Sequence, residues 1–161
     1  MAVINGIDRI DVDNVLKKLG REIKKIEKRT DKGLTLAALH VKGTAQEFTP
    51  IDEGNLRASA YVISPDKKVA FKGGRFESKK SKADTGKLLN DHEVEMISSK
   101  AESQRWPESA IIGYSAYYAV FVHEIDNNYK APGVSWMYLA RALKQERRMI
   151  LKIIKDRAKI K

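Results

Sequence analysis

Cysteine is absent from the 161 residues of this chain. A disulfide scaffold, a thiolate zinc site and a cysteine nucleophile are therefore all excluded. Long apolar runs are also missing, because no stretch approaches the ~20 residues that a membrane-spanning helix needs. The first residues lack the basic-then-apolar order of a secretory signal. We therefore expect a protein that is made and used without export and has no membrane partner.

Motifs for catalysis and for cofactor binding are also scarce. The three histidines, His40, His92 and His123, do not stand at the His-x-x-x-His spacing typical of zinc sites. The serine of Gly-Tyr-Ser-Ala lacks the Gly-x-Ser-x-Gly turn of a hydrolase nucleophile. Gly73 and Gly74 are not followed by the Lys-Ser/Thr pair of a phosphate-binding loop. The sequence thus predicts no enzyme, no metal site and no cofactor.

The composition is that of one globular domain with an excess of positive charge. Hydrophobic residues make up 42% of the chain, charged residues 32%, and the net charge is +10. Most of this excess lies in the last 21 residues, which carry nine basic and two acidic side chains. Such a basic end is typical of a solvated helix face, of a nucleic-acid contact or of a contact with an acidic protein surface.

Helical periodicity dominates both ends of the chain. Apolar residues from Val12 to Ile26 predict a first helix capped by Asp11 or Asp13. A second helix should follow Thr30 or Asp31 and stop by Phe48 or Thr49, because the next residue is a proline. A long amphipathic helix is predicted over 135–159. Its polar side carries a row of cations, called here the basic stripe: Arg141, Lys144, Arg148, Lys152, Lys155 and Lys159.

The middle of the chain has weaker signals. Pro50 and Gly54 predict a turn, and strands are expected over 56–64 and 109–114. The apolar run 116–124 fits a buried strand or a short buried helix, with Tyr117 and Tyr118 in the core. Residues 66–108 are expected to form an irregular loop, mobile near 72–86, with a short turn at 87–90 and a strand at 92–98. The predicted fold class is α+β: two N-terminal helices, a small antiparallel sheet, and the long C-terminal amphipathic helix packed on it.

Residues in and after the turn at Pro50–Gly54 suggest local roles without reference to any family. Gly54 can adopt a positive φ, and Asp52 or Asn55 can cap the chain that follows. Arg57 is hypothesised to pair with the carboxylate of Glu124; the alternative is that Arg57 is simply solvated.

Three stretches of the sequence carry a resemblance to a known family. They are Thr49-Pro50-Ile51-Asp52-Glu53-Gly54-Asn55-Leu56-Arg57-Ala58-Ser59, then Ile112-Gly113-Tyr114-Ser115-Ala116-Tyr117-Tyr118-Ala119-Val120-Phe121-Val122-His123-Glu124, then Ser135-Trp136-Met137-Tyr138-Leu139-Ala140-Arg141-Ala142-Leu143 at the start of the closing helix. Together they resemble the tail-component or minor-capsid family of tailed bacteriophages. The chain departs from the family pattern at Glu53, at Ile125-Asp126 and at Met137-Tyr138.

This resemblance implies a structural virion protein of the head–tail neck that acts in tail completion or head–tail joining. It implies a ring of copies of the chain, a hexamer, assembled in the host cytoplasm against connector, neck and tail proteins, with genome DNA as a further contact. The loop 66–108 is the docking candidate, through Phe71, Gly73, Gly74, Arg75 and Phe76. The alternative function is non-specific nucleic-acid binding by the basic stripe.

Overall fold

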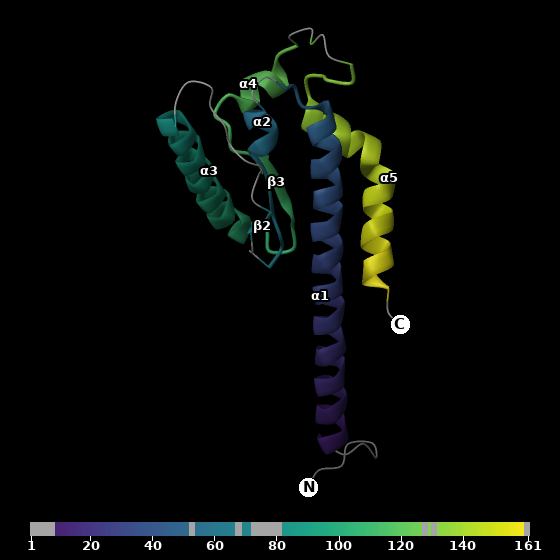
Figure 1. Cartoon of the computed structure of the whole chain (residues 1–161). Coiled ribbons are helices and arrows are strands. Elements are labelled where there is room, and N and C mark those ends of the chain that lie inside the picture. The colour runs from purple at the N-terminus through teal and green to yellow at the C-terminus, as the bar shows by residue number, and fades with distance from the viewer. Residues whose placement is uncertain are drawn as a thin grey trace.

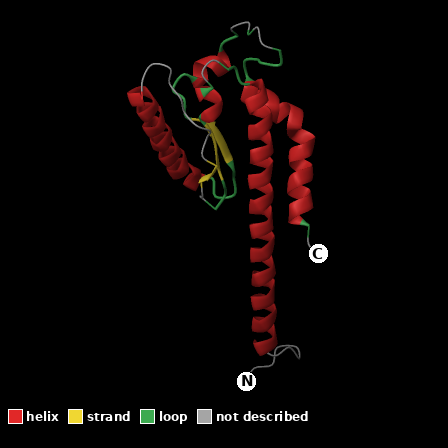
Figure 2. Cartoon of the chain, in the orientation of Figure 1, coloured by secondary structure: helices red, strands yellow, loops and turns green. Residues whose placement is uncertain are grey.

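The computed structural model describes residues 9–51, 54–66, 69–71, 82–126, 129 and 132–159 (Figures 1 and 2). Helices dominate the described residues, and the small antiparallel sheet and the long C-terminal amphipathic helix are present as predicted. In chain order the elements are α1 (Arg9–Phe48), α2 (Asn55–Ala58), β1 (Ala60–Ile63), β2 (Val69–Phe71), α3 (Lys82–Glu102), the 3-10 turn η1 (Ser103–Arg105), β3 (Ile111–Tyr114), α4 (Ala119–Glu124) and α5 (Tyr138–Ala158).

The described strands form one antiparallel sheet in the order β2-β1-β3. It lies between α3 and the second half of α1, and α5 runs beside α1 (Figure 1). All four residues of the central strand β1 are buried. Tyr61 and Ile63 point to the α3 side, where they pack with Met96. Ile112 of β3, level with Val62, instead packs against the cluster that joins α1 to α5. Alternate residues of one strand pair thus serve two cores.

The first 40 helical residues form a single helix, so the prediction of two N-terminal helices is wrong. The break expected at Thr30 or Asp31 does not occur: the hydroxyl of Thr30 donates to the Ile26 carbonyl (3.0 Å), one turn earlier in the same helix, and the Asp31 carbonyl accepts from the hydroxyl of Thr35 (2.8 Å). Asp11 and Asp13 lie within the helix rather than at its cap. The predicted end at Phe48 is confirmed.

Two further predictions in the middle of the chain are corrected. Residues 55–58 form the helical turn α2, so the predicted strand 56–64 shortens to β1. The expected irregular segment 66–108 contains the 21-residue helix α3 in place of the turn at 87–90 and the strand at 92–98. His92 and Met96, one helical turn apart, are buried side chains of this helix.

The long C-terminal helix is confirmed, but its main packing partner is α1 rather than the sheet. Ala142, fully buried, packs with Val41 and Ala45 of α1. Near the other end of α5, a Cβ on Gly33 would lie 3.2 Å from the Cα of Ile154. Because α1 numbers fall as α5 numbers rise, the two helices are antiparallel and closely spaced.

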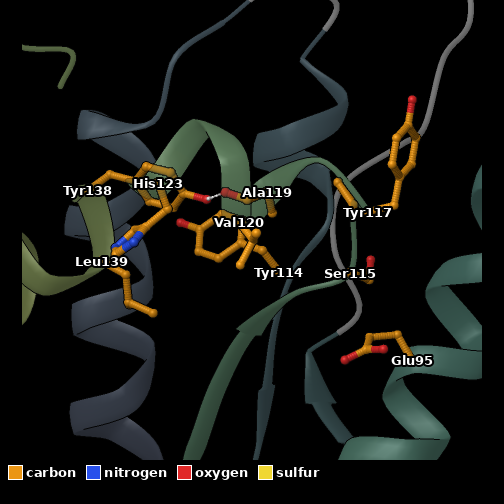
Figure 3. Close-up of a pocket in the computed structure, with 10 residues that line it drawn as sticks. Glu95, Tyr114, Ser115, Tyr117, Ala119, Val120, His123, Tyr138 and Leu139 are labelled. Carbon is orange, nitrogen blue, oxygen red and sulfur yellow. Dashed lines mark hydrogen bonds between the residues drawn. The ribbon is translucent and has the colours of Figure 1, made fainter. Parts of the chain in front are cut away.

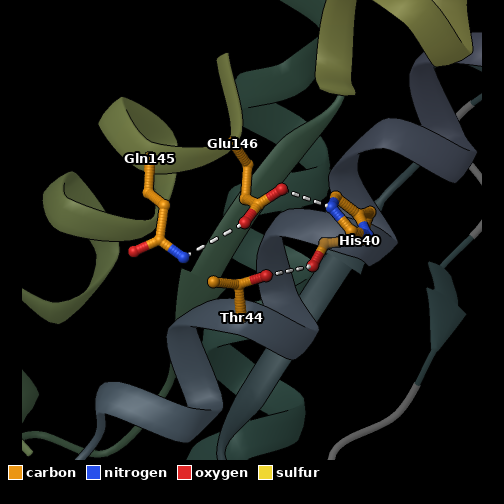
Figure 4. Close-up of polar contacts among 4 residues, drawn as sticks. All are labelled: His40, Thr44, Gln145 and Glu146. Carbon is orange, nitrogen blue, oxygen red and sulfur yellow. Dashed lines mark hydrogen bonds and ion pairs between the residues drawn. The ribbon is translucent and has the colours of Figure 1, made fainter. Parts of the chain in front are cut away.

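A polar contact also joins these two helices (Figure 4). Nε2 of His40 lies 2.7 Å from a carboxylate oxygen of Glu146, whose side chain is only 17% exposed. The hydrogen bond with His40 lowers the pKa of the Glu146 carboxyl, with a smaller effect from Gln145.

This lowered pKa predicts acid-dependent stability. A carboxyl with a depressed folded-state pKa stabilises the fold above its unfolded pKa, about 4.3, and loses that contribution as the pH falls through the folded value. Glu146→Gln should therefore be less stable than the wild type near pH 6, and the difference should shrink by pH 3. Urea denaturation at both pH values measures it. Glu93→Gln, on the exposed side of α3, is the control; a difference for Glu146→Gln that does not change with pH would contradict the prediction.

Candidate functional site

The basic stripe is present as predicted, on the outer side of α5. All six of its residues are exposed. Two members are partly held by neighbours: the Arg141 guanidinium lies 4.7 Å from the centre of the Phe48 ring and donates to the Ser135 hydroxyl, and Lys159 pairs with Asp156 at 2.9 Å. The lysines between them extend along a helix face that contributes nothing to the core. The stripe is thus available to a partner.

The turn after α1 positions an arginine on the open end of that helix. Gly54 has φ 82°, the positive value expected, and Asn55 begins α2 and is buried. Pro50 follows the buried Thr49, whereas Asp52 lies outside the described residues. Arg57 donates from Nε and Nη2 to the Thr49 carbonyl (3.1 and 3.0 Å) and from Nη2 to the Glu47 carbonyl (3.3 Å). These carbonyls lie at the helix end, where intrahelical donors run out.

The hypothesised pair of Arg57 with Glu124 is not formed. Arg57 is occupied by the two backbone carbonyls at the end of α1, and the Glu124 carboxylate instead lies 2.6 Å from Nδ1 of His123. Arg57 is also not simply solvated, which was the alternative. The carbonyls at the end of α1 bind the Arg57 guanidinium in place of the Glu124 carboxylate. They offer several acceptors, and the negative end of the helix dipole favours a cation.

Arg57→Ala should therefore destabilise the fold by about 1–2 kcal/mol, through loss of hydrogen bonds from a charged donor. Glu124→Ala should change the unfolding free energy by less than ~0.5 kcal/mol, and the double variant should be additive. Urea denaturation of the three variants tests this. A coupling energy above ~0.5 kcal/mol between the two sites would contradict the assignment.

The predicted docking loop falls mostly outside what can be described. Phe71 is the last residue of β2. Gly73, Gly74, Arg75 and Phe76 lie outside the described residues. Their role in docking stays a prediction.

An exposed apolar surface replaces part of the predicted core. Tyr117 is 80% exposed, and Val120, Phe121 and Ile125 are each at least half exposed. We call these four residues the α4 patch. Val120 and Phe121 lie in α4, and Tyr117 and Ile125 flank it. At about 100° per residue the four positions span about 140° of a helical turn, so they share one side of it. Ala119 is the fully buried residue of α4 and Val122 is half-buried against the same core cluster, whereas the side chains of the α4 patch stay outside. The prediction that Tyr117 lies in the core is wrong, and Tyr118 is half-buried.

The α4 patch adjoins an open pocket of about 350 Å³ (Figure 3). Its wall includes Tyr114, His123 and Tyr138, with Glu95 entering from α3. The Tyr138 hydroxyl donates to the Ala119 carbonyl at 3.1 Å. Burial raises the pKa of the Tyr114 and Tyr138 hydroxyls, so both stay protonated near neutral pH. Nε2 of His123 is buried without a hydrogen-bond partner among the described residues.

The pocket does not assemble a recognisable catalytic set. The nearest approach to one is the hydrogen bond between Nδ1 of His92 and the Ser115 hydroxyl. His92 is only 2% exposed and its ring meets that of Tyr61 edge-on at 6.1 Å, so the bond ties α3 to the sheet. Among the described residues, no three His, Asp or Glu side chains gather to hold a metal ion. None of the described helices is long and apolar enough to cross a membrane.

Comparison with known protein families, with curated proteins and with solved structures finds no match to this chain.

Proposed function

We propose that this chain is a structural assembly subunit that works through its surfaces rather than through catalysis. The observation that carries the proposal is the pair of unlike exposed surfaces on one small protein: the apolar α4 patch at one end and the basic stripe along α5. Large exposed apolar side chains grouped on one helical face are typical of protein–protein contact sites. A polar active site would require convergent titratable groups, and the pocket offers few.

The two surfaces suit a head-to-tail contact between copies of the chain. A ring needs two different, complementary patches on each subunit. Residues 106–140, which include the α4 patch, also carry three exposed acidic side chains: Glu108, Glu124 and Asp126. The basic stripe carries the opposite charge. We infer that the α4 patch of one subunit lies against α5 of the next. The motif resemblance makes the head–tail neck of a tailed bacteriophage the proposed location, with a hexamer as the proposed ring.

Electron microscopy of particles tests the proposed location. In lysates of a virus that lacks this gene, we expect filled heads beside free tails, because the joint between them is missing. Intact infectious particles would overturn the neck assignment. Complementation with Phe121→Lys should fail to restore joining, whereas complementation with Val94→Lys, an equally exposed apolar site on α3, should restore it.

Nucleic-acid binding is the second candidate, and the exposure of all six residues of the basic stripe favours it. A contact with several phosphates would give tight binding to duplex DNA that weakens steeply with salt. The double variant Lys152→Glu/Lys155→Glu should then have a shallower dependence of log K on log salt concentration, by the amount that about two phosphate contacts contribute. Normal virion joining together with such binding would favour this candidate over the structural one.

A further inference from the structure

The first half of α1 carries an exposed apolar row. Val12, Val15, Leu16, Leu19 and Ile23 are between 44% and 62% exposed, on the part of the helix that projects beyond the rest of the molecule (Figure 1). A surface helix of a monomer normally turns such a row toward its own core. Here no described element lies against it.

The row continues the face of α1 that α5 covers farther along. At about 100° per residue, Leu19, Ile26 and Gly33 share one side of the helix, and Gly33 faces Ile154 of α5. The end of α5 is fixed beside α1, because Nη1 of Arg29 donates to the Lys159 carbonyl at 3.1 Å. The apolar row of α1 therefore becomes exposed at the level where α5 ends.

We propose that this row is the seat for a second copy of the chain, bound through an antiparallel pairing of the two α1 helices. The seat comprises Val12, Val15, Leu19 and Ile23 of this row together with the half-buried Ile26, and their spacing of three, four, four and three residues is symmetric about Leu19. Leu16, the remaining member of the row, lies at its edge. A reversed second helix thus presents the same ladder: Ile26 beside Val12, Ile23 beside Val15, and Leu19 beside Leu19. Such self-complementarity is what a two-fold contact requires.

The register of this pairing also fits around α5. When Leu19 meets Leu19, Arg9 of the second copy lies level with Arg29 of the first. The second α1 therefore begins where α5 ends, and the two share one face of α1 end to end. A parallel pairing would instead carry the second α1 across the face that α5 already occupies. The overlap of the 15 residues from Val12 to Ile26 spans roughly 22 Å at ~1.5 Å per residue.

Apolar burial, rather than charge, drives the proposed contact. One flank of the row carries Lys18, Glu22 and Lys25, and the other carries Asp13, Lys24 and Glu27, so the two signs are balanced. Because the overlap is short, the dimer is weak and concentration-dependent. This inference does not depend on the proposed function.

Sedimentation equilibrium over a range of concentrations tests the proposal. The apparent mass should rise from the monomer value of 18.2 kDa toward twice that value as concentration increases. Leu19→Lys should remain a monomer at every concentration, with unchanged unfolding when dilute, since lysine is as good a helix former as leucine. Ile97→Lys, an exposed apolar site on α3, should still dimerise. A wild-type protein that stays monomeric throughout would overturn the proposal.

Cysteine crosslinking tests the orientation, and the cysteine-free chain makes it simple. Under a mild oxidant, Leu19→Cys should crosslink to itself. Val12→Cys alone should not, but an equal mixture of Val12→Cys and Ile26→Cys chains should crosslink. Self-crosslinking of Val12→Cys as efficient as that of Leu19→Cys would show parallel helices and overturn the antiparallel assignment. These readouts do not depend on the lysine variant being folded, nor on any test of ring assembly.

Discussion

Replacing Tyr138 by alanine is expected to lower the free energy of unfolding by about 3–5 kcal/mol, the range typical of large aromatic truncations in a core. Tyr138 is the first residue of α5 and is 1% exposed. It packs with Leu56 and Ala119, so it joins α5 to α2 and α4. Its ring also meets those of Tyr114 at 5.0 Å and His123 at 4.8 Å, both edge-on. Removing the ring would empty the point where four elements meet.

The matched variant Tyr138→Phe separates the ring from the hydroxyl. It keeps the aromatic packing and removes only the hydrogen bond to the Ala119 carbonyl. We expect it to cost about 1 kcal/mol. Urea denaturation followed by circular dichroism measures both variants. An alanine variant within ~1 kcal/mol of the wild type would show that Tyr138 does not hold these elements together.

The parts of the fold that the sequence predicted well are those with strong and uniform patterns. The helix α5 separates apolar from basic residues over its whole length, and the stripe from Arg141 to Lys159 is exposed as predicted. The end of α1 was predictable because Pro50 disfavours helical backbone in the residue before it. The positive φ of Gly54 followed from turn chemistry alone.

The parts that were missed depend on contacts that local sequence does not contain. Thr30 and Asp31 resemble a helix start, but packing of Gly33 against α5 keeps α1 continuous there. In α3 the helical periodicity of apolar residues is weak, because one of its buried positions is occupied by the polar residue His92. The apolar run 116–124 has two possible inner sides, and the structure buries Ala119 and half-buries Tyr118 and Val122. Tertiary packing overrides propensity in each case.

The same reasoning applies to the candidate site. The basic stripe could be found from charge periodicity, whereas the α4 patch could not, because a sequence does not state which apolar residues are left outside. Arg57 was correctly singled out, but its partners are backbone carbonyls of Glu47 and Thr49. Side chains that bind a helix end are hard to predict, because the acceptors are backbone carbonyls, which every residue type carries.

A single methyl group at Gly113 is expected to destabilise the sheet by up to about 3 kcal/mol, the upper part of the range for overpacking. Gly113 of β3 pairs with Tyr61 of β1. A Cβ on Gly113 would lie 2.3 Å from Cζ and 2.4 Å from the hydroxyl oxygen of Tyr61, so the phenol ring occupies the space of the missing side chain. That ring cannot move freely, because its hydroxyl is 2.6 Å from the Ser99 hydroxyl of α3.

Gly20→Ala is the control for Gly113→Ala, because it makes the same chemical change where nothing lies within 4 Å of the new atom. In the interior of α1 alanine is a better helix former than glycine, so this variant should be more stable than the wild type by ~0.5–1 kcal/mol. The two substitutions should therefore shift the urea midpoint in opposite directions. In Gly113→Ala the displaced Tyr61 should also lose its bond to Ser99, so Ser99→Ala should cost less in that background than in the wild type. If Ser99→Ala lowers the free energy of unfolding equally in both backgrounds, the added methyl group is accommodated by a shift of the strands, and the ring of Tyr61 keeps its position.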